Sequence, residues 1–197
     1  MSSPLESIDI GFTFRSGVNP TDSRLMEAVE RLPNLNSISF DIMWNVTSSG
    51  ICSVARAMAD QLLHLKISAN CITSHHYLSD ATMEAIGDSC KNLKSFTYHV
   101  VHYDKYYQDT AWTDLFTDYG IISLVDKCRH LETLCIWNAQ KVTEEAFVTI
   151  LDMIEQGNAA SANPTDNHEG YALRTIDLRG YKFIVTGNPL RIETIGS

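Results

Sequence analysis

The stretch HLETLCIWNAQKVTEEAF, residues 130–147, decides the fold. It opens with apolar residues at Leu131, Leu134 and Ile136, and the last two alternate with polar residues, which is the period of a short half-buried strand. The stretch then becomes polar, and Thr143 followed by two glutamates is typical of a helix start. If this pattern recurs, the chain is built from repeated units of one strand and one helix.

The apolar pattern L-x-x-L-x-I occurs five more times along the chain. The five copies are Leu5/Ile8/Ile10, Leu35/Ile38/Phe40, Leu62/Leu65/Ile67, Leu93/Phe96/Tyr98 and Leu173/Ile176/Leu178. With Leu131 included, the starts are separated by 30, 27, 31, 38 and 42 residues. A single match is common by chance, but six at quasi-regular spacing indicate an internal repeat.

The segments between the copies predict helices. Counting back 10, 7 and 3 residues from four successive motif leucines gives only apolar residues, and this spacing puts each triplet on one helical face. The triplets are Leu25/Ala28/Leu32, Cys52/Ala55/Ala59, Met83/Ile86/Cys90 and Ile121/Leu124/Cys128. Ser79 and Asp80 are expected to start the third of these helices.

A fifth helix is predicted after Thr143, with an apolar stripe of Phe147, Ile150 and Ile154 that ends at the sequence EQGN. Residues 157–170 carry no apolar face and are expected to form a surface loop. One helix and one strand per unit cannot bury a core alone, whereas stacked units can. The sequence therefore predicts one α/β domain over residues 1–197, a solenoid of about six irregular repeats with a parallel sheet inside and helices outside.

This pattern resembles the leucine-rich repeats of the ribonuclease-inhibitor-like type, and within them the cysteine-containing subclass of F-box leucine-rich-repeat proteins. The match is carried by LSDATMEAIGDSCKNLKSFTYH, residues 78–99, in which Cys90 stands three residues before Leu93. The same junction recurs in LVDKCRHLETLCI with Cys128 and Leu131. The resemblance implies a horseshoe that binds a protein partner, as in the substrate-binding part of a ubiquitin-ligase receptor.

The chain departs from this family in three respects. The family usually has Asn or Cys eight residues after each motif leucine, but here only Asn70 fits, among Thr13, Met43, Asn70, Val101, Ala139 and Tyr181. No F-box precedes Leu5, and neither end shows an evident polar cap, which would leave an edge strand exposed. We therefore expect either a fragment of a longer chain or partner elements that cover the ends.

Composition excludes several classes of function. The formal net charge is −9 and the 15 basic residues are scattered, which disfavours nucleic-acid and anionic-membrane surfaces. The five cysteines form no C-x-x-C pair, and no secretory signal opens the chain, so a cytoplasmic or nuclear protein is expected. His99-x-x-His102 with Asp104 lacks a nearby cysteine for zinc, and we expect no metal and no cofactor.

The candidate binding residues follow from strand alternation. Polar residues flanking the apolar positions should line the open side of the sheet, and one column ends in His99, Trp137 and Arg179 on adjacent strands. Aromatic and arginine side chains dominate protein-binding hot spots. The alternative is that Trp137 packs under a neighbouring loop. Tyr103, Tyr106 and Tyr107 follow the fourth strand and form a second candidate surface, with local packing as its alternative.

No catalytic motif such as a phosphate loop or G-x-S-x-G is present. We therefore expect a non-enzymatic scaffold for protein recognition, of unknown oligomeric state. One alternative is a structural subunit held in a larger complex through its repeat ends. A second is a small-molecule sensor or enzyme using His64, Lys66 and His99, which the lack of an apolar pocket in the pattern disfavours.

Overall fold

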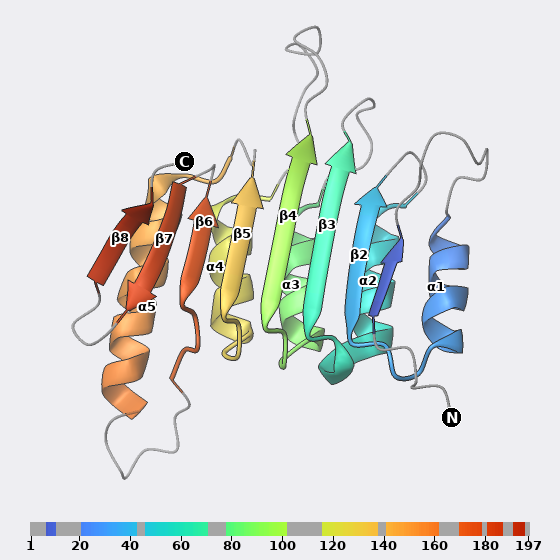
Figure 1. The fold of residues 1–197 in the computed structure, drawn as a ribbon, viewed down its shortest axis with the longest axis horizontal. Coiled ribbons are helices and arrows are strands. Elements are labelled where there is room, and N and C mark those ends of the chain that lie inside the picture. The colour runs from blue at the N-terminus through green and yellow to red at the C-terminus, as the bar shows by residue number, and fades with distance from the viewer. Residues whose placement is uncertain are drawn as a thin grey trace, which may run out of the picture.

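The computed structural model forms an α/β fold with one sheet and helices on one of its faces (Figure 1). It describes residues 7–10, 21–42, 46–70, 78–101, 116–137, 141–161, 170–178, 181–186 and 191–195, with side chains within 21–39, 46–68, 78–99, 116–137, 141–159 and 170–177. The strands are β1 (Ser7–Ile10), β2 (Ser37–Ile42), β3 (His64–Asn70), β4 (Ser95–Val101), β5 (Thr133–Trp137), β6 (Thr175–Leu178), β7 (Tyr181–Thr186) and β8 (Arg191–Ile195). The helices are α1 (Asp22–Arg31), α2 (Ser48–Met58), the short 3-10 helix η1 (Ala59–Gln61), α3 (Asp80–Ser89), α4 (Asp118–Lys127) and α5 (Glu144–Ser161).

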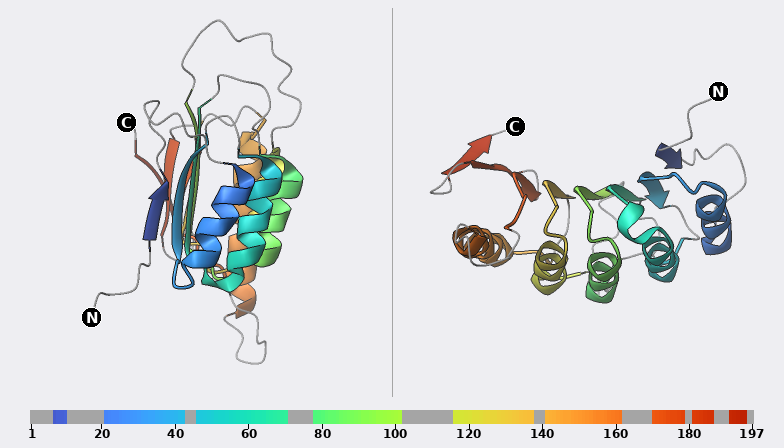
Figure 2. Two further views of the ribbon diagram at one scale, coloured as in Figure 1. Left: turned by 90° about the vertical axis from the view of Figure 1, so that its right-hand side faces the viewer. Right: turned by 90° about the horizontal axis from the view of Figure 1, so that it is seen from below.

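Strands and helices form two curved layers. The strands lie in chain order from β1 to β8, and α1–α5 cover one face of the sheet. Seen from below, the uncovered face of the sheet is on the inner side of the curve and the helices are on the outer side (Figure 2). We call the uncovered face of β2–β6 the open face.

The six predicted strands are confirmed as β1–β6, and they pair in parallel. The register joins equivalent residues of successive copies, so that Ile38 pairs with Leu65, Leu65 with Phe96, and Phe96 with Leu134. This register keeps the apolar positions whose side chains are described on the helix side, because neighbouring residues of a strand point to opposite faces. In β5, for example, Leu134 and Ile136 are fully buried.

The predicted helical stripes are confirmed in full for α3 and α4, where all six residues are buried, whereas in α1 and α2 only Leu25 and Ala55 of the predicted residues are buried. Cys52 and Ala59 are only half-buried, and the buried face of α2 contains Ile51, Val54 and Met58. Ala59 ends α2 with a left-handed φ of 44° and η1 follows directly. The buried face of α2 is therefore rotated by about one residue from the predicted stripe.

The predicted end of the fifth helix is also wrong, because α5 continues through the sequence EQGN to Ser161. Gly157 lies against the ring of Tyr171, at a distance where a Cβ atom would come within 2.6 Å of Cε2. Asn158 Oδ1 accepts a hydrogen bond of 2.9 Å from the Tyr171 N–H. Gly157 and Asn158, which resemble a helix stop in the sequence, instead fit α5 against the segment before β6. Residues 162–169 of the expected loop lie outside the described residues.

The sheet continues beyond β6, the last of the predicted strands. β7 pairs with β6 in the antiparallel direction, and β8 pairs with β7 in the same way. β7 begins at Tyr181, three residues after Leu178, the last apolar position of the sixth copy. The sixth copy is therefore followed by two further strands and not by another helix.

Carboxylates bridge the starts of neighbouring helices. Asp80, the first residue of α3, accepts hydrogen bonds from Thr117 N–H (2.7 Å) and Oγ1 (2.9 Å), and Thr117 is the N-cap of α4. The Gly120 N–H donates to the same carboxylate at 3.1 Å, and a Cβ on Gly120 would come within 2.5 Å of Asp80 Oδ1. The equivalent bridges join Asp22 to Thr47 and Asp118 to Thr143.

We expect Asp80→Ala to lower the free energy of unfolding by about 1–3 kcal/mol, because it leaves a half-buried N-cap and two backbone donors without their acceptor. The exposed Asp152 of α5 provides the control, and Asp152→Ala should change stability by less than about 0.5 kcal/mol. Urea unfolding followed by circular dichroism measures both. Equal effects of the two substitutions would contradict the bridging role.

Two buried thiols connect successive units. Cys90 Sγ–H donates to the Ala55 carbonyl at 3.5 Å, and Cys128 Sγ–H donates to the Cys90 carbonyl at 3.3 Å. Both side chains are at most 1% exposed, as expected from the sequence for small buried residues. Burial is the main cause that raises the pKa of each thiol from 9.0 to about 12.

These thiols should make the fold sensitive to alkali. In the unfolded chain they ionise near pH 9.0, whereas in the folded chain they keep their protons to about pH 12. The unfolded state therefore binds fewer protons in this range, and stability falls with rising pH by at most about 1.4 kcal/mol per pH unit for each thiol. Cys90→Ala with Cys128→Ala should flatten this dependence in urea unfolding between pH 8 and 10.5, whereas Val148→Ala, which removes an exposed side chain without a titratable group, should leave the slope unchanged. A double variant with the wild-type slope would contradict the assignment.

Candidate functional site

The open face is lined by three rows of side chains that the register fixes. The rows run across the strands, and none of their members is buried. The first row is Ser37, His64, Ser95, Thr133 and Thr175; the second is Ser39, Lys66, Thr97, Cys135 and Asp177; the third is Ser68, His99 and Trp137.

His99 and Trp137 come together in the third row. They pair directly across β4 and β5, and their ring centroids lie 5.1 Å apart at an interplanar angle of 73°, an edge-to-face contact. The Trp137 side chain is 40% exposed, so the indole keeps a large accessible surface. This exposure favours an accessible tryptophan over one packed under a loop. The third predicted member, Arg179, lies outside the described residues, as do Tyr103, Tyr106 and Tyr107.

Few charged side chains surround this pair on the open face. Lys66 and His64 are exposed on β3, and Thr97 is half-buried between Lys66 and Cys135. On β6, Asp177 lies opposite Cys135, and its Oδ1 atom is buried without a hydrogen bond among the described residues. The face offers aromatic contact area and single hydrogen-bonding groups, which suits the binding of an extended surface.

A pocket of about 470 Å³ lies away from this face. It is formed by the turns that precede β2 and β3, whereas His99 and Trp137 lie toward the carboxyl ends of their strands. Its lining residues are Pro33, Asn34, Leu35, Asn36, Asp60, Gln61 and Leu63. No sequence pattern predicted this pocket, because its lining comes from turns without a motif.

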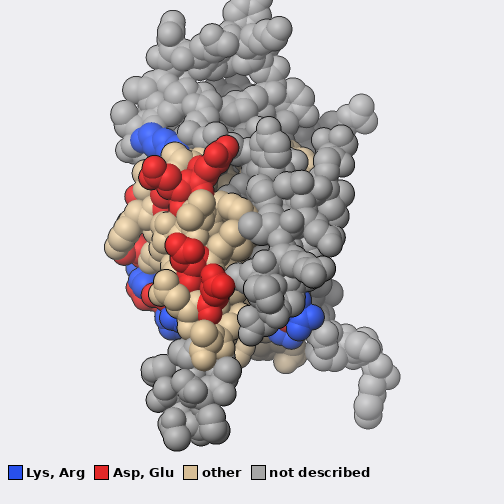
Figure 3. Space-filling view, turned by 90° about the vertical axis from the view of Figure 1, so that its left-hand side faces the viewer, with Lys and Arg blue, Asp and Glu red and all other residues tan. Residues whose placement is uncertain are grey.

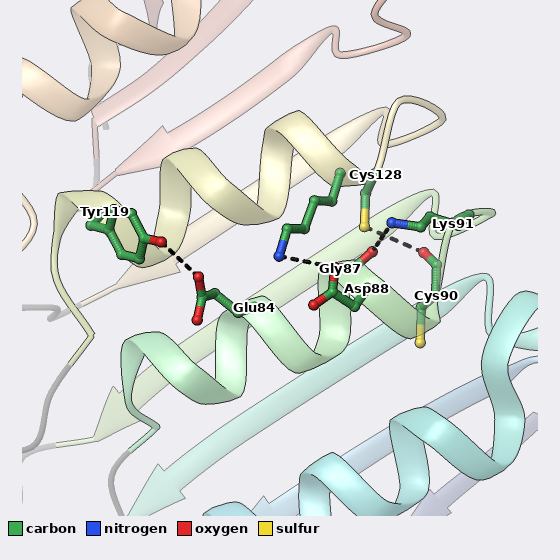
Figure 4. Close-up of polar contacts among 8 residues, drawn as sticks. Glu84, Gly87, Asp88, Cys90, Lys91, Tyr119 and Cys128 are labelled. Atoms are coloured by element: carbon green, nitrogen blue, oxygen red, sulfur yellow. Dashed lines mark hydrogen bonds and ion pairs between the residues drawn. The ribbon is translucent and has the colours of Figure 1, made fainter.

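The outer helical face holds a separate set of polar contacts between α3 and α4 (Figure 4). The Tyr119 hydroxyl donates to Glu84 at 2.7 Å, and this hydrogen bond is the main cause that raises the Tyr119 pKa. Lys127 forms an ion pair of 2.9 Å with Asp88, which raises the Lys127 pKa. Because each contact joins neighbouring helices, we interpret this set as structural.

No group of three or more metal-ligating side chains occurs within the described ranges. His102 and Asp104 of the H-x-x-H pattern lie outside those ranges. Among the described helices, none has the length and apolar character needed to cross a bilayer. No protein-family model matches the chain, and no curated protein has significant sequence similarity to it.

Trp137 should contribute little to stability compared with its buried neighbour on β5. We expect Trp137→Ala to cost about 1 kcal/mol or less, since it removes a part-exposed side chain and one aromatic contact. Ile136→Ala, at a fully buried position, should cost about 2–5 kcal/mol. Chemical denaturation of both variants makes the comparison. A larger loss for Trp137→Ala would show that the indole serves the core.

Proposed function

We propose that this chain is a leucine-rich-repeat solenoid of the ribonuclease-inhibitor-like, cysteine-containing subclass. Three features support the proposal: six motif copies paired in parallel with equivalent residues aligned, helices on one face of the strands, and a curve with the open face inside. The hydrogen bonds of Cys90 and Cys128 to the preceding unit give the subclass cysteine a physical role.

We further propose that the chain is a non-enzymatic scaffold for protein recognition and binds its partner on the open face. The observation that carries this proposal is the His99–Trp137 pair, since an exposed tryptophan held by a neighbouring ring is preorganised for burial in an interface. By its resemblance, the chain is the substrate-binding repeat domain of an F-box-like ubiquitin-ligase receptor.

The alternative is an assembly subunit that contacts its complex through the ends of the sheet. β1 and β8 support this second role, because each pairs with only one neighbour in the described sheet. Unpaired strand edges are ready sites for pairing with another chain.

The test is a quantitative pull-down from native lysate with the wild-type chain and a His99→Ala, Trp137→Ala double variant. The matched control is Tyr119→Ala with Val148→Ala, which removes two exposed apolar side chains from the helices. We expect specific partners to be lost by at least about tenfold with the open-face variant only. Partners that persist undiminished with it, at an unchanged thermal melt, would refute open-face recognition and favour contacts through the sheet ends.

A further inference from the structure

The open face of β3, β4 and β5 lacks the acidic character of the rest of the chain. The chain has a formal net charge of −9, yet no Asp or Glu occurs among the outward residues of these three strands in the rows defined above. The only formal charge among them is that of Lys66, which is exposed, and the two histidines add further N–H donors. These residues are His64, Lys66, Ser68, Ser95, Thr97, His99, Thr133, Cys135 and Trp137.

The described carboxylates gather elsewhere. Apart from Asp177 on β6, every Asp and Glu whose side chain is described lies on a helix or on a turn between a helix and a strand. The end of the molecule formed by α5 shows this acidic surface (Figure 3), where Glu144, Glu145, Asp152 and Glu155 are all exposed. An acidic partner would therefore meet less repulsion on the open face of β3–β5 than on the acidic end formed by α5.

We propose that the partner surface is an acidic segment of a protein that docks across β3–β5. This inference rests on the proposed recognition function and adds the chemistry of the partner. A partner carboxylate pairs with Lys66 and is within reach of the neighbouring His64, while an apolar side chain of the same segment covers the exposed indole of Trp137. Asp177 limits the surface on the β6 side, since it is the first described carboxylate on this face.

The register sets the distance between Lys66 and Trp137, the two residues that contact the partner segment in this proposal. Lys66 pairs with Thr97, Thr97 pairs with Cys135, and Trp137 stands two residues beyond Cys135. The backbones of Lys66 and Trp137 are therefore two strand spacings and two residues apart, which corresponds to about 12 Å, or about four residues of an extended chain. The partner segment should therefore carry an acidic residue three to five positions from an apolar one.

A protein segment fits this surface better than a nucleic acid. A polyanion gains its affinity from many displaced counterions, which needs clustered lysines and arginines. These three rows contain one lysine within a chain of strongly negative charge. A protein segment that carries one or two carboxylates beside an apolar side chain matches this single lysine and the neighbouring indole.

In the test, the whole chain is the target for selection from a displayed library of random dodecapeptides. The most enriched peptides are then synthesised, and their affinity for the chain is measured by fluorescence anisotropy. The variants are Lys66→Glu, Trp137→Ala and, as the matched charge reversal on the helical side, Arg56→Glu, whose side chain is exposed on α2. We expect enriched peptides to be acidic, to weaken by at least about tenfold with Lys66→Glu or Trp137→Ala, and to weaken by less than about twofold with Arg56→Glu. Circular dichroism confirms that each variant is folded.

Four results would overturn the inference, and one of them would also refute the proposed function. Neutral or basic peptides that depend on Trp137 would keep open-face recognition but refute the acidic partner. Acidic peptides weakened equally by Lys66→Glu and Arg56→Glu, or displaced by a twelve-nucleotide single-stranded RNA, would refute a protein-specific site. A library without any binder that depends on Trp137 would refute both the partner chemistry and open-face recognition.

Discussion

In-register parallel pairing of short strands is the constraint on which the rest of this structure depends. The strands that carry the motif have between 4 and 7 residues, and none can bury a core with one helix alone. Only when Leu65, Phe96 and Leu134 stand side by side does a continuous apolar layer meet the helices. The carboxylate bridges and the thiol hydrogen bonds reinforce this register, because each joins equivalent points of neighbouring units. Variation in unit length is therefore confined to the connections.

The sequence predicted the features that depend on the period of apolar residues and on the spacing of the motif copies. A period of two fixed β1–β6 and their register, and the i, i+3, i+7 stripe fixed the inward faces of α3 and α4. It did not predict local backbone geometry, such as the positive φ at Ala59, or the rotated buried face of α2. Gly157 and Asn158 misled the prediction of α5, because residues that often end helices also make room for a ring and accept a backbone donor. The strands β7 and β8 carry no repeat motif and were missed.

The candidate site, like the fold, was predictable only in part. Alternation and register were sufficient to make His99 and Trp137 neighbours, but the edge-to-face contact and the exposed fraction required coordinates. The carboxylate bridges did leave a signal in the sequence. A Ser or Thr stands 14 or 15 residues before each of four motif leucines, and an acidic residue follows three of these four, at Thr21, Ser79 and Thr117. Read together with the leucines, this second periodic pattern would have located the helix starts.

The antiparallel pairing of β7 on β6 has a consequence for how such a chain can change in length. A duplicated unit of helix and strand needs a free edge that accepts a parallel neighbour, and the outer edge of β6 is occupied by a strand of the opposite direction. A gene duplication that adds units can then be accommodated before β1 or between units that already pair in parallel, but not after β6. Related proteins of different length should accordingly differ in the number of units before β6 and retain the two-strand hairpin after the last one.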